Sequence, residues 1–544
     1  SSVSTMIKST PQPAVEPHRA SAHEGPPSHP RALSLSNLVL LAALSVFGAV
    51  IGIQLIVTLG VTPNTSIIGA LVAMILSRIP VQLLRSYRSV HAQNLAQTAI
   101  SSATFGAANS LLLPLAIPYL LGRPDMVLPM FLGVGLAMLL DAYMLYRLFG
   151  STVFPATGAW PPGVAAAEAI KAGDQGGTQA KLLGLGIVVG TVGSWFKIPM
   201  SAFGVAFIGN IWALAMFGIG LLLRGYSEPL FGVDISKQYI PHGMMIGAGL
   251  VALVQVVMVM RSKSGPKASG PTGPSVGSSL RLGGVGYILL SAGISVLAGL
   301  YADMSVPMLL GFILYAAFAA LVHELIVGIA AMHSGWFPAF AVALITLLLG
   351  LLIGFPPHAL AILCGFSVAT GPAFADMGYD LKAGYMLRGN GADMALELEG
   401  RKQQLIAAML AFLIAIPVVY FSYGALFDGG QLPPVAKVYV ATINAGATPG
   451  IAHMLLIWAI PGAVIQLIGG PKRQLGVLLA TGLLIANPLA GWAVAAGIVL
   501  RLLIEKVGGE KHRNHMEVFA GGIIAGDAIF SFFNATITSH FGKK

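Results

Sequence analysis

The segment GNIWALAMFGIGLLLR, from Gly209 to Arg224, is an apolar run that ends in a single cation. It belongs to a stretch of about 205–224 that is long enough to cross a lipid bilayer as a helix. A similar segment, ANPLAGWAVAAGIVLR, occupies Ala486 to Arg501. Asn210 and Asn487 hold matching places in the two segments, 277 positions apart, as do the terminal arginines. This pair of segments predicts membrane helices and an internal repeat.

The composition of the whole chain agrees with membrane helices. Hydrophobic residues make up 56% of the 544 positions and charged residues 9%, and the mean hydropathy is +0.82. A soluble protein carries about a quarter charged residues, so this chain has too few to cover a water-facing surface. The 67 glycines suit helices that approach closely within a membrane. We therefore expect an all-α polytopic membrane protein.

Charge and cysteine content exclude several other classes. The single cysteine, Cys364, rules out an intrachain disulfide and a cysteine-based metal site, and we expect no metal centre. The formal net charge is +10, but no basic cluster interleaves with aromatic residues. We assign the excess of Lys and Arg to cytoplasmic loops and expect no nucleic-acid partner.

Further apolar runs extend this pattern along the chain. About sixteen transmembrane helices are expected, in two pseudo-symmetric halves with re-entrant or broken segments. The run 94–122 contains Asn109 and Pro114, so we expect it to be a broken pair. The runs lie at about 36–60, 64–79, 94–122, 127–149, 180–203, 205–224, 238–260, 281–301, 305–331, 337–354, 358–376, 402–423, 449–469, 473–486, 488–504 and 516–535.

Two polar stretches divide the chain into domains. Residues 1–34 are rich in Pro, Ser and His and predict a disordered cytoplasmic tail. Residues 261–280 begin RSKSGPKASGPTGPS, the composition of a flexible cytoplasmic linker. The first transmembrane half then covers 35–260 and the second covers 281–544.

Other likenesses refine the repeat. HGMMIGAGLVAL, from His242, matches AGGIIAGDAIFS, from Ala520, at a spacing of 278. AEAIKAGD, from Ala167, resembles GYDLKAGY, from Gly378, at a spacing of only 211. That shorter spacing predicts an insertion of about 65 residues in the second half, around 427–448.

The charges of the tail, the linker and the C-terminus set the expected topology. All three are net positive, which places both termini in the cytoplasm and makes the repeats parallel, related by an axis along the membrane normal. The net basic loop from Arg501 to Arg513 argues against this assignment.

Phe154 to Asp174, FPATGAWPPGVAAAEAIKAGD, is the first segment that can carry chemistry. Its three prolines prevent a continuous helix, and irregular backbone at membrane depth occurs only where protein or a water-filled cavity surrounds it. Glu168 lies in an Ala-rich stretch, where a carboxylate is costly unless it faces a cavity or a partner. We expect a re-entrant element on the substrate path; an interfacial loop with a Pro-capped helix is the alternative.

Gly371 to Arg388, GPAFADMGYDLKAGYMLR, is the second such segment. Asp376 and Asp380 are four apart and share one face of a helix, whereas Lys382, two positions on, does not face Asp380. The acids predict substrate binding or proton relay, with a solvated helix end as the alternative.

Four segments in order resemble the oligopeptide transporter family. They are LGVTPNTSIIGALVAMI (59–75), NLAQTAISSA (94–103), FPATGAWPPGVAAAEAIKAG (154–173), and DLKAGYML followed by RKQQ (380–404). The resemblance covers the chain from Arg31 to Phe533 and leans towards the prokaryotic and yellow-stripe-like branch.

This resemblance implies about sixteen helices in two halves and secondary transport driven by protons, and no enzymatic activity. The implied substrates are small peptides or peptide-like metal chelates, such as complexes of nicotianamine-type ligands. The implied location is the bacterial inner membrane, with the lipid bilayer as partner and a homodimer left open. No cofactor is implied beyond the driving ion, H⁺.

The family pattern points to several site residues. The family motif FP-small-G-x-A-x-A-E falls on Phe154, Pro155, Gly163, Ala165, Ala167 and Glu168, with the extra residues Ala156 to Pro162 between FP and Gly. DLKTGYL falls on 380–386 with Ala383 in place of Thr. The candidates for the substrate and proton pathway are Glu168, Asp380, Lys382, Tyr385, Asp376, Glu324, Asn94, Gln97, Pro162 and Gly163. Glu168 is the first choice for the proton-coupling residue and Asp380 the second.

Other polar residues receive structural interpretations. The insert after Arg388 brings three acids, Asp393, Glu397 and Glu399, which we interpret as a solvated loop. We expect Asp141, Asn210, Asn487 and Asp527 to support helix packing. His323 and Glu324 begin a zinc-protease motif, but Val327 stands where its second His belongs.

Two rival functions remain. Tyr379–Asp380 and Gly526–Asp527 resemble the paired acids of intramembrane aspartyl proteases, although Ile524 replaces the expected Gly. A carrier for amino acids or nucleobases is the closer alternative.

Overall fold

The computed structural model describes residues 29–59, 66–261, 275–335, 339–447 and 449–541. Nearly all of this part of the chain is helical and it contains no strand, which confirms the all-α class. Residues 1–28 of the expected tail, most of the linker 261–280, and the terminal Lys543 and Lys544 lie outside the described residues. The expectations for those segments stay predictions.

The first half runs from α3 to α12. Its elements are α3 (Leu35–Leu59), α4 (Ser66–Ser77), η1 (Gln82–Arg88), α5 (Val90–Phe105), η2 (Gly106–Leu112), α6 (Leu113–Leu120), η3 (Pro124–Met126), α7 (Val127–Leu148), α8 (Pro161–Gln175), α9 (Gly177–Trp195), α10 (Met200–Val205), α11 (Ile211–Phe231) and α12 (Ile240–Arg261).

The second half follows the linker. Its elements are α13 (Val276–Leu297), η4 (Leu300–Ala302), α14 (Val306–Ser334), α15 (Ala339–Ile353), α16 (Pro357–Ala369), α17 (Pro372–Leu387), α18 (Met394–Asp428), α19 (Pro434–Ala445), α20 (Ile451–Arg473), α21 (Leu475–Leu484), α22 (Pro488–Gly508), η5 (Gly509–His512) and α23 (Arg513–Phe541).

Many of these helices are fit to cross a membrane. Within the described ranges, nine helical stretches are long and apolar enough to do so by length and composition, and four more apolar helices are shorter. The protein is therefore a polytopic membrane protein, and several of the sixteen expected runs are short or interrupted helices.

The run 94–122 was expected to be a broken pair, and that prediction is wrong. The elements α5, η2 and α6 form one helical stretch of 31 residues, Val90–Leu120. A π-helical turn, Gly106–Leu112, takes up Asn109 and leads directly into Pro114. The wider turn accommodates a proline that lacks the N–H needed for a regular α-helical ladder.

An interruption occurs instead between α16 and α17. Gly371 has φ 117°, which only glycine adopts readily, and Pro372 then starts α17. Together the two helices make the stretch Pro357–Leu387, which also has 31 residues. A second break separates α10 from α11, inside the expected run 205–224.

The two halves repeat the same order of elements. Val90 and Pro357 begin the two 31-residue stretches, 267 positions apart, while α11 and α22 have 21 residues each and begin 277 apart. The packing repeats as well, because α9 lies against α23 as α20 lies against α12. The helix α13 stands outside the repeat and packs on α7 and α14.

This order corrects the expected insertion of about 65 residues. The counterpart of α8 is α19, within 427–448, and α17 is the counterpart of α6. The segments that resemble each other, in α8 and α17, pack together. A Cβ on Gly163 would lie 2.4 Å from the Tyr379 carbonyl oxygen, so their shared small residues serve close contact rather than mark a repeat.

The repeats are inverted rather than parallel. Ser101 contacts Asp376, Ser110 donates to the carbonyl of Ala369, and a Cβ on Gly365 would lie 3.5 Å from Pro114. Residue numbers rise along one 31-residue stretch as they fall along the other, so these equivalent spans run antiparallel. The two-fold axis that exchanges them is perpendicular to both spans and lies in the plane of a membrane that they cross.

Contacts at the ends of the spans agree with inversion. The N–H of Ala32, just before α3, donates to Gln403 near the start of α18 at 2.9 Å. Tyr119 donates to Asp428 at the other end of α18. The equivalent of α3 in the second half is α14. Asp303, just before α14, bonds to His358 at the start of α16, so α14 begins beside the Asp428 end of α18. The sequence predicted parallel repeats because the tail, the linker and the C-terminus are all net positive. The charge of these segments does not show how many helices between them are too short or too broken to cross the membrane.

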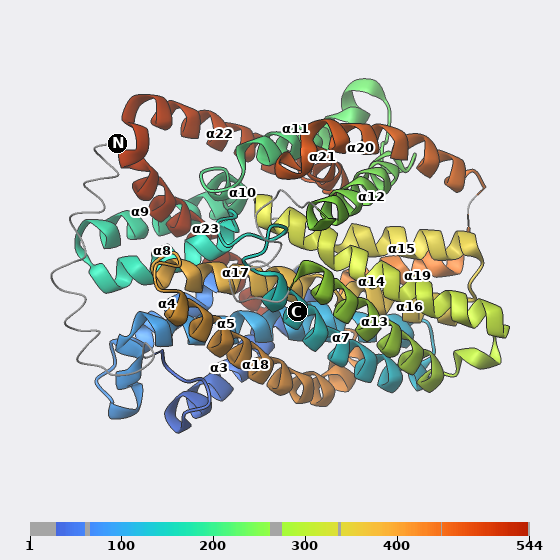
Figure 1. Ribbon diagram of the computed structural model, residues 1–544, viewed down its shortest axis with the longest axis horizontal. Coiled ribbons are helices and arrows are strands. Elements are labelled where there is room, and N and C mark those ends of the chain that lie inside the picture. The colour runs from blue at the N-terminus through green and yellow to red at the C-terminus, as the bar shows by residue number, and fades with distance from the viewer. Residues whose placement is uncertain (1–28, 60–65, 262–274, 336–338, 448, 542–544) are drawn as a thin grey trace.

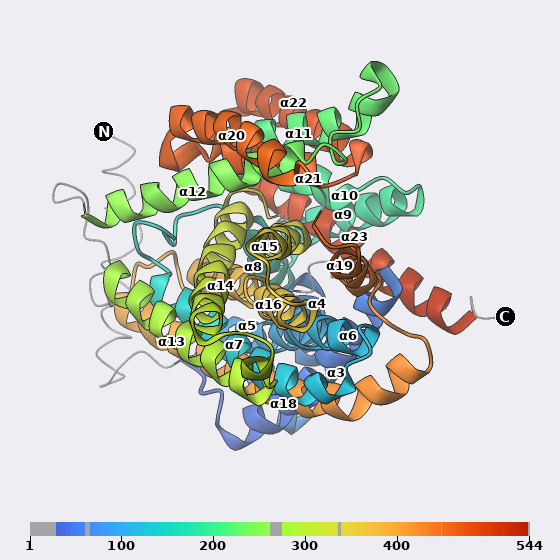
Figure 2. The same cartoon turned by 90° about the vertical axis from the view of Figure 1, so that its right-hand side faces the viewer.

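The helices α5, α8 and α17 pack against one another in the middle layer of the molecule (Figure 1). In both views α11, α21 and α22 lie on one side of them, and α3, α7 and α18 on the other (Figure 2). In an apolar 18-residue window of each of the stretches Val90–Leu120 and Pro357–Leu387, 94% of the residues are buried, far more than in the outer spans. Polar side chains on these stretches are therefore placed away from lipid.

Candidate functional site

Two acids of α17 and one serine of α5 form the centre of the site. Asp376 and Asp380 lie one turn apart on the same face of α17, as expected, and both are fully buried. The hydroxyl oxygen of Ser101 lies 2.8 and 2.9 Å from the oxygens of Asp376, and 2.8 and 3.0 Å from those of Asp380. We call Asp376 and Asp380 the central carboxyl pair.

Other polar side chains surround the central carboxyl pair. Ser66, at the start of α4, donates to Asp380 at 3.4 Å, and Ser102 lies 3.5 Å from the same side chain. Gln404 of α18 donates to the backbone carbonyl of Asp380 at 2.6 Å and to Thr98 at 3.0 Å. The carboxyl pair thus contacts hydroxyls of α4 and α5, while α18 bonds to the backbone beside it.

Asn94 and Gln97 extend the site along α5. Both are fully buried, and Gln97 Nε2 donates to Asn94 Oδ1 at 3.0 Å. The Asn94 amide nitrogen and the Gln97 amide oxygen have no hydrogen-bond partner among the described residues. A buried polar group without a partner is costly, so these two atoms are candidates for ligand contact.

Lys382 and Tyr385 face the other side of α17. Lys382 donates to the carbonyl of Ala156 at 2.9 Å, and its ammonium lies 5.3 Å from the centre of the Tyr385 ring. The structure therefore separates Lys382 from Asp380, as the spacing of two residues predicted.

The proline-rich segment is an irregular stretch followed by the short helix α8. Trp160 has φ 39°, its N–H donates to the carbonyl of Met332, and α8 starts at Pro161. Pro162 packs against Gly335 at the end of α14, since a Cβ there would lie 2.9 Å from its ring. Ala165 of α8 and Ala375 of α17 have no exposed surface, so neither faces lipid.

Glu168 lies on α8, apart from the central carboxyl pair. It is 4% exposed, and its nearest cation is Lys171, 3.9 Å away on the same helix. A polar cavity of about 340 Å³ lies near the ends of α4 and α8, lined by Met74, Ser77, Arg78, Arg88, Gln93, Gly173 and Asp174.

Glu324 belongs to a separate cluster. It accepts a hydrogen bond from the Tyr287 hydroxyl at 2.6 Å, and it lies beside Asp141. Asp141 accepts the N–H groups of Gly371 and Phe374, at 2.8 and 3.0 Å, which confirms its expected structural role at the start of α17. His323 bonds to the carbonyl of Ser367, which gives this residue a structural explanation without zinc.

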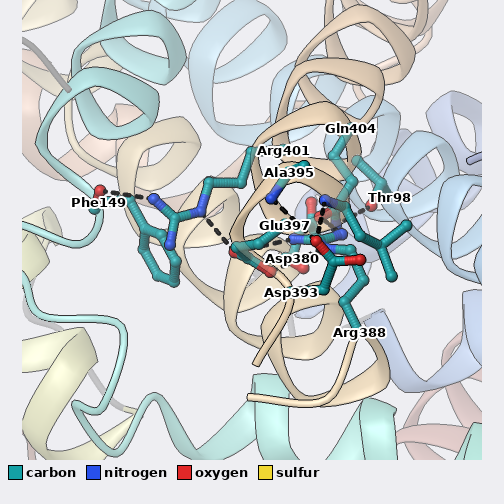
Figure 3. A network of polar contacts seen from close by, with 10 residues as sticks. Thr98, Phe149, Asp380, Arg388, Asp393, Ala395, Glu397, Arg401 and Gln404 are labelled. Carbon is teal, nitrogen blue, oxygen red and sulfur yellow. Dashed lines mark hydrogen bonds and ion pairs between the residues drawn. The ribbon is translucent and has the colours of Figure 1, made fainter. Parts of the chain in front are cut away.

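The acid-rich insert is the main error in the expected site. Glu397 is fully buried in the first turn of α18, where it pairs with Arg388 at 2.8 Å and Arg401 at 2.5 Å. Figure 3 shows that Arg388 also reaches Gln404, the residue that holds Asp380 and Thr98. The expected solvated loop is therefore wrong for Glu397, because two cations neutralise it inside the protein.

Sequence reasoning missed Ser101, Thr98 and Gln404. One signal was present: polar residues recur through the apolar span at intervals of three or four, which puts them on one helical face. We call this set the polar stripe of α5; it consists of Asn94, Gln97, Thr98, Ser101 and Ser102.

The protease alternative does not fit these contacts. Asp527 of α23 accepts hydrogen bonds from Ser194 and Ser201, at 2.7 and 2.5 Å, in a cluster with α9 and α10. Asp380 is held by α5 and α18 instead. The two acids lie in separate clusters and form no catalytic pair.

Comparison with known proteins agrees with the earlier resemblance. The chain matches the family model described as OPT oligopeptide transporter protein over residues 33–260 and 270–538. No curated protein matches it. The matched residues cover both transmembrane halves, and the branch within the family stays a prediction. The chain therefore belongs to the OPT oligopeptide transporter family and is a multi-pass membrane transporter for peptides rather than an enzyme.

Proposed function

We propose that the protein uses a proton gradient to import small peptides, or peptide-like metal chelates, across a bacterial inner membrane. In this proposal the central carboxyl pair carries the driving proton. The observation that supports it most is the single Ser101 hydroxyl within 3.0 Å of all four carboxylate oxygens of Asp376 and Asp380.

The proton count at this site favours a bound proton. A serine hydroxyl donates one hydrogen bond, so it cannot satisfy both acids by donation alone. Two carboxylates close together in a dry site repel each other and do not both stay ionised. The arrangement is stable when Asp376 or Asp380 holds a proton, and it can release that proton when another positive charge arrives.

A peptide or a chelate supplies such a charge. A peptide brings an ammonium group, and a chelate brings a metal cation. The unpartnered amide nitrogen of Asn94 and amide oxygen of Gln97 match a peptide carbonyl and a peptide N–H. Both lie on the polar stripe of α5, one or two turns from Ser101. Substrate and proton then meet on one helix face.

Glu168 is the second candidate for coupling. It is buried, with Lys171 at 3.9 Å on its own helix and Glu517 of α23 near enough for its charge to act on it, but no hydrogen bond among the described residues links it to the central carboxyl pair. The carboxylates of the central carboxyl pair contact hydroxyls of α4 and α5, and the backbone carbonyl of Asp380 accepts Gln404 of α18. Binding or loss of a proton at the central carboxyl pair therefore changes contacts between helices directly, which is why we rank Asp380 above Glu168.

Uptake by purified protein in liposomes tests this function. Labelled di- and tripeptides, a metal–nicotianamine complex, a free amino acid and a nucleobase would be offered with and without an alkaline interior. A difference of one pH unit stores about 1.4 kcal/mol per proton, enough for up to about tenfold accumulation. We expect gradient-dependent accumulation of a peptide or the chelate, abolished by a protonophore. Uptake that ignores the gradient, or accumulation of the amino acid or nucleobase alone, would contradict the proposal.

A further inference from the structure

A second pair of acids lies where α16 gives way to α17. Asp141 of α7 and Glu324 of α14 are both fully buried. Asp141 Oδ2 accepts the N–H groups of Gly371 and Phe374, so it caps the first turn of α17. Glu324 Oε2 accepts the hydroxyl of Tyr287 from α13 at 2.6 Å. We call Asp141 and Glu324 the second carboxyl pair.

The second carboxylate oxygen of each acid lacks a hydrogen-bond donor in the part of the chain that the structure describes. Asp141 Oδ1 and Glu324 Oε1 find no donor among the described residues. Both acids lie at the start of α17, because Asp141 accepts the N–H of Gly371 and Val327, one turn after Glu324 on α14, packs against Gly371. They are close enough for the charge of Asp141 to act on Glu324. Two carboxylate oxygens can bond to each other only with a proton between them, because an ionised carboxylate is an acceptor only. One proton would satisfy both atoms.

The environment also indicates which acid holds that proton. Asp141 accepts two backbone N–H groups at the N-terminus of α17, where a helix stabilises negative charge. Glu324 receives a single neutral hydroxyl. The proton therefore belongs on Glu324 Oε1 and is donated to Asp141 Oδ1.

The neighbouring helices do not bring a cation to the pair. Within the part of the chain that the structure describes, Asp141 is the charged group that acts on Glu324, and Tyr287 contacts it as a neutral hydroxyl donor. The cations and histidines of the surrounding helices bond elsewhere, as follows: Arg147 to Ser278 and Ser279, Arg281 to Gly277, His323 to Ser367, His333 to Asn210, His358 to Asp303, and Lys382 to Ala156.

We propose that Asp141 and Glu324 form a second proton-binding site, holding one proton, which keeps the break between α16 and α17 closed. Loss of the proton places two like charges side by side in a dry interior, where they repel strongly. Asp141 is bonded to the first turn of α17, so separation of the acids moves that turn. Asp376 lies only two residues beyond Phe374, so the movement reaches the central carboxyl pair.

The bound proton can be observed directly in the whole protein. A protonated carboxyl has an infrared carbonyl band that shifts when H₂O is exchanged for D₂O. We expect the difference between the parent and Glu324→Gln to contain one such band at neutral pH. The glutamine amide can still donate to Asp141 and accept from Tyr287, so the contacts survive. The matched control is Glu228→Gln, at an exposed glutamate on α11, which should leave the band region of protonated carboxyl groups unchanged.

A second variant separates a proton from a structural effect. Tyr287→Phe removes the donor to Glu324 Oε2 and leaves the shared proton in place. The band should then persist and move to higher frequency, as a carbonyl does when it loses a hydrogen bond. Absence of any difference band for Glu324→Gln, or a band that ignores Tyr287→Phe, would overturn the proposal.

The use of this proton in transport rests on the proposed function. In liposomes, Glu324→Gln should still exchange substrate but should move one proton fewer per substrate than the parent. An unchanged ratio would show that the proton does not take part in the cycle and would overturn that step. If the parent moved no protons at all, the proposed function would fail, and the infrared bands would still decide whether the second site exists.

Discussion

Ser101 shows how one residue organises the site. A serine in an apolar span commonly bonds to the carbonyl one turn earlier, as Thr104 does with Ile100 at 2.8 Å. Ser101 instead reaches across to α17 and contacts both acids of the central carboxyl pair. The sequence showed its place on a polar helical face, but the partner is 275 residues away and no local pattern identifies it.

Replacing this serine should weaken the site. Ser101→Ala leaves two buried acids without their shared donor, which we expect to cost about 1–3 kcal/mol of stability. Gradient-driven uptake should fall much more than the amount of folded protein. Uptake in liposomes and thermal unfolding in detergent would measure the two effects.

Ser110→Ala is the matched control, because this buried serine of the same span donates to the carbonyl of Ala369 instead. It should leave uptake close to that of the parent. Equal uptake by Ser101→Ala and Ser110→Ala would contradict a special role for Ser101.

Glu397 marks the limit of reading single residues. Three acids in a polar insert suggest solvent, and Asp393 does cap α18 at an exposed turn. Glu397 lies four residues on and is fully buried between two arginines. Composition alone does not show whether an acid meets water or a cation, because the cations come from α17 and a later turn of α18.

At the scale of elements, α8 and α17 depend on contact between backbones. Gly163 lies against the carbonyl of Tyr379 and the stem of Lys382, and Gly378 lies against the ring of Trp160, which an added Cβ would meet at 2.2 Å. The sequence predicted a re-entrant, proline-rich element here and a likeness between it and α17. The sequence did not show that α8 and α17 are not equivalent elements of the two halves. Two helices rich in small residues look alike in sequence whether they are repeat partners or simply pack closely together.

A methyl group at this contact should be poorly tolerated. In Gly163→Ala the new Cβ would lie 2.4 Å from a backbone oxygen, so the helices must separate, at a cost of about 1–3 kcal/mol. Thermal unfolding in detergent should show a lower midpoint.

Gly184→Ala provides the comparison, since a Cβ there meets nothing within 4 Å. Alanine favours helix over glycine, so its midpoint should equal or exceed that of the parent. A Gly163→Ala midpoint as high as that of Gly184→Ala would show that α8 is not packed as described.

At the scale of the molecule, the sequence revealed two halves but misjudged their direction. Asn210 and Asn487 each cap an equivalent helix, α11 and α22, so that likeness was sound. Direction depends on how many segments cross the membrane, and helices as short as α10, with 6 residues, or broken as α16–α17, leave that count open. The antiparallel contact of the two 31-residue stretches settles the direction and places the central carboxyl pair where the halves meet.

The central claim is that a proton on the central carboxyl pair couples the gradient to substrate movement. Asp380→Asn keeps the size of the side chain and can still bond to Ser101, but it cannot exchange a proton. The most direct measurement compares two modes of transport by this variant in liposomes, with Glu228→Gln as the control. We predict that exchange of substrate at equal concentrations continues, while accumulation driven by an alkaline interior disappears. Accumulation by Asp380→Asn equal to that of the parent would contradict the account.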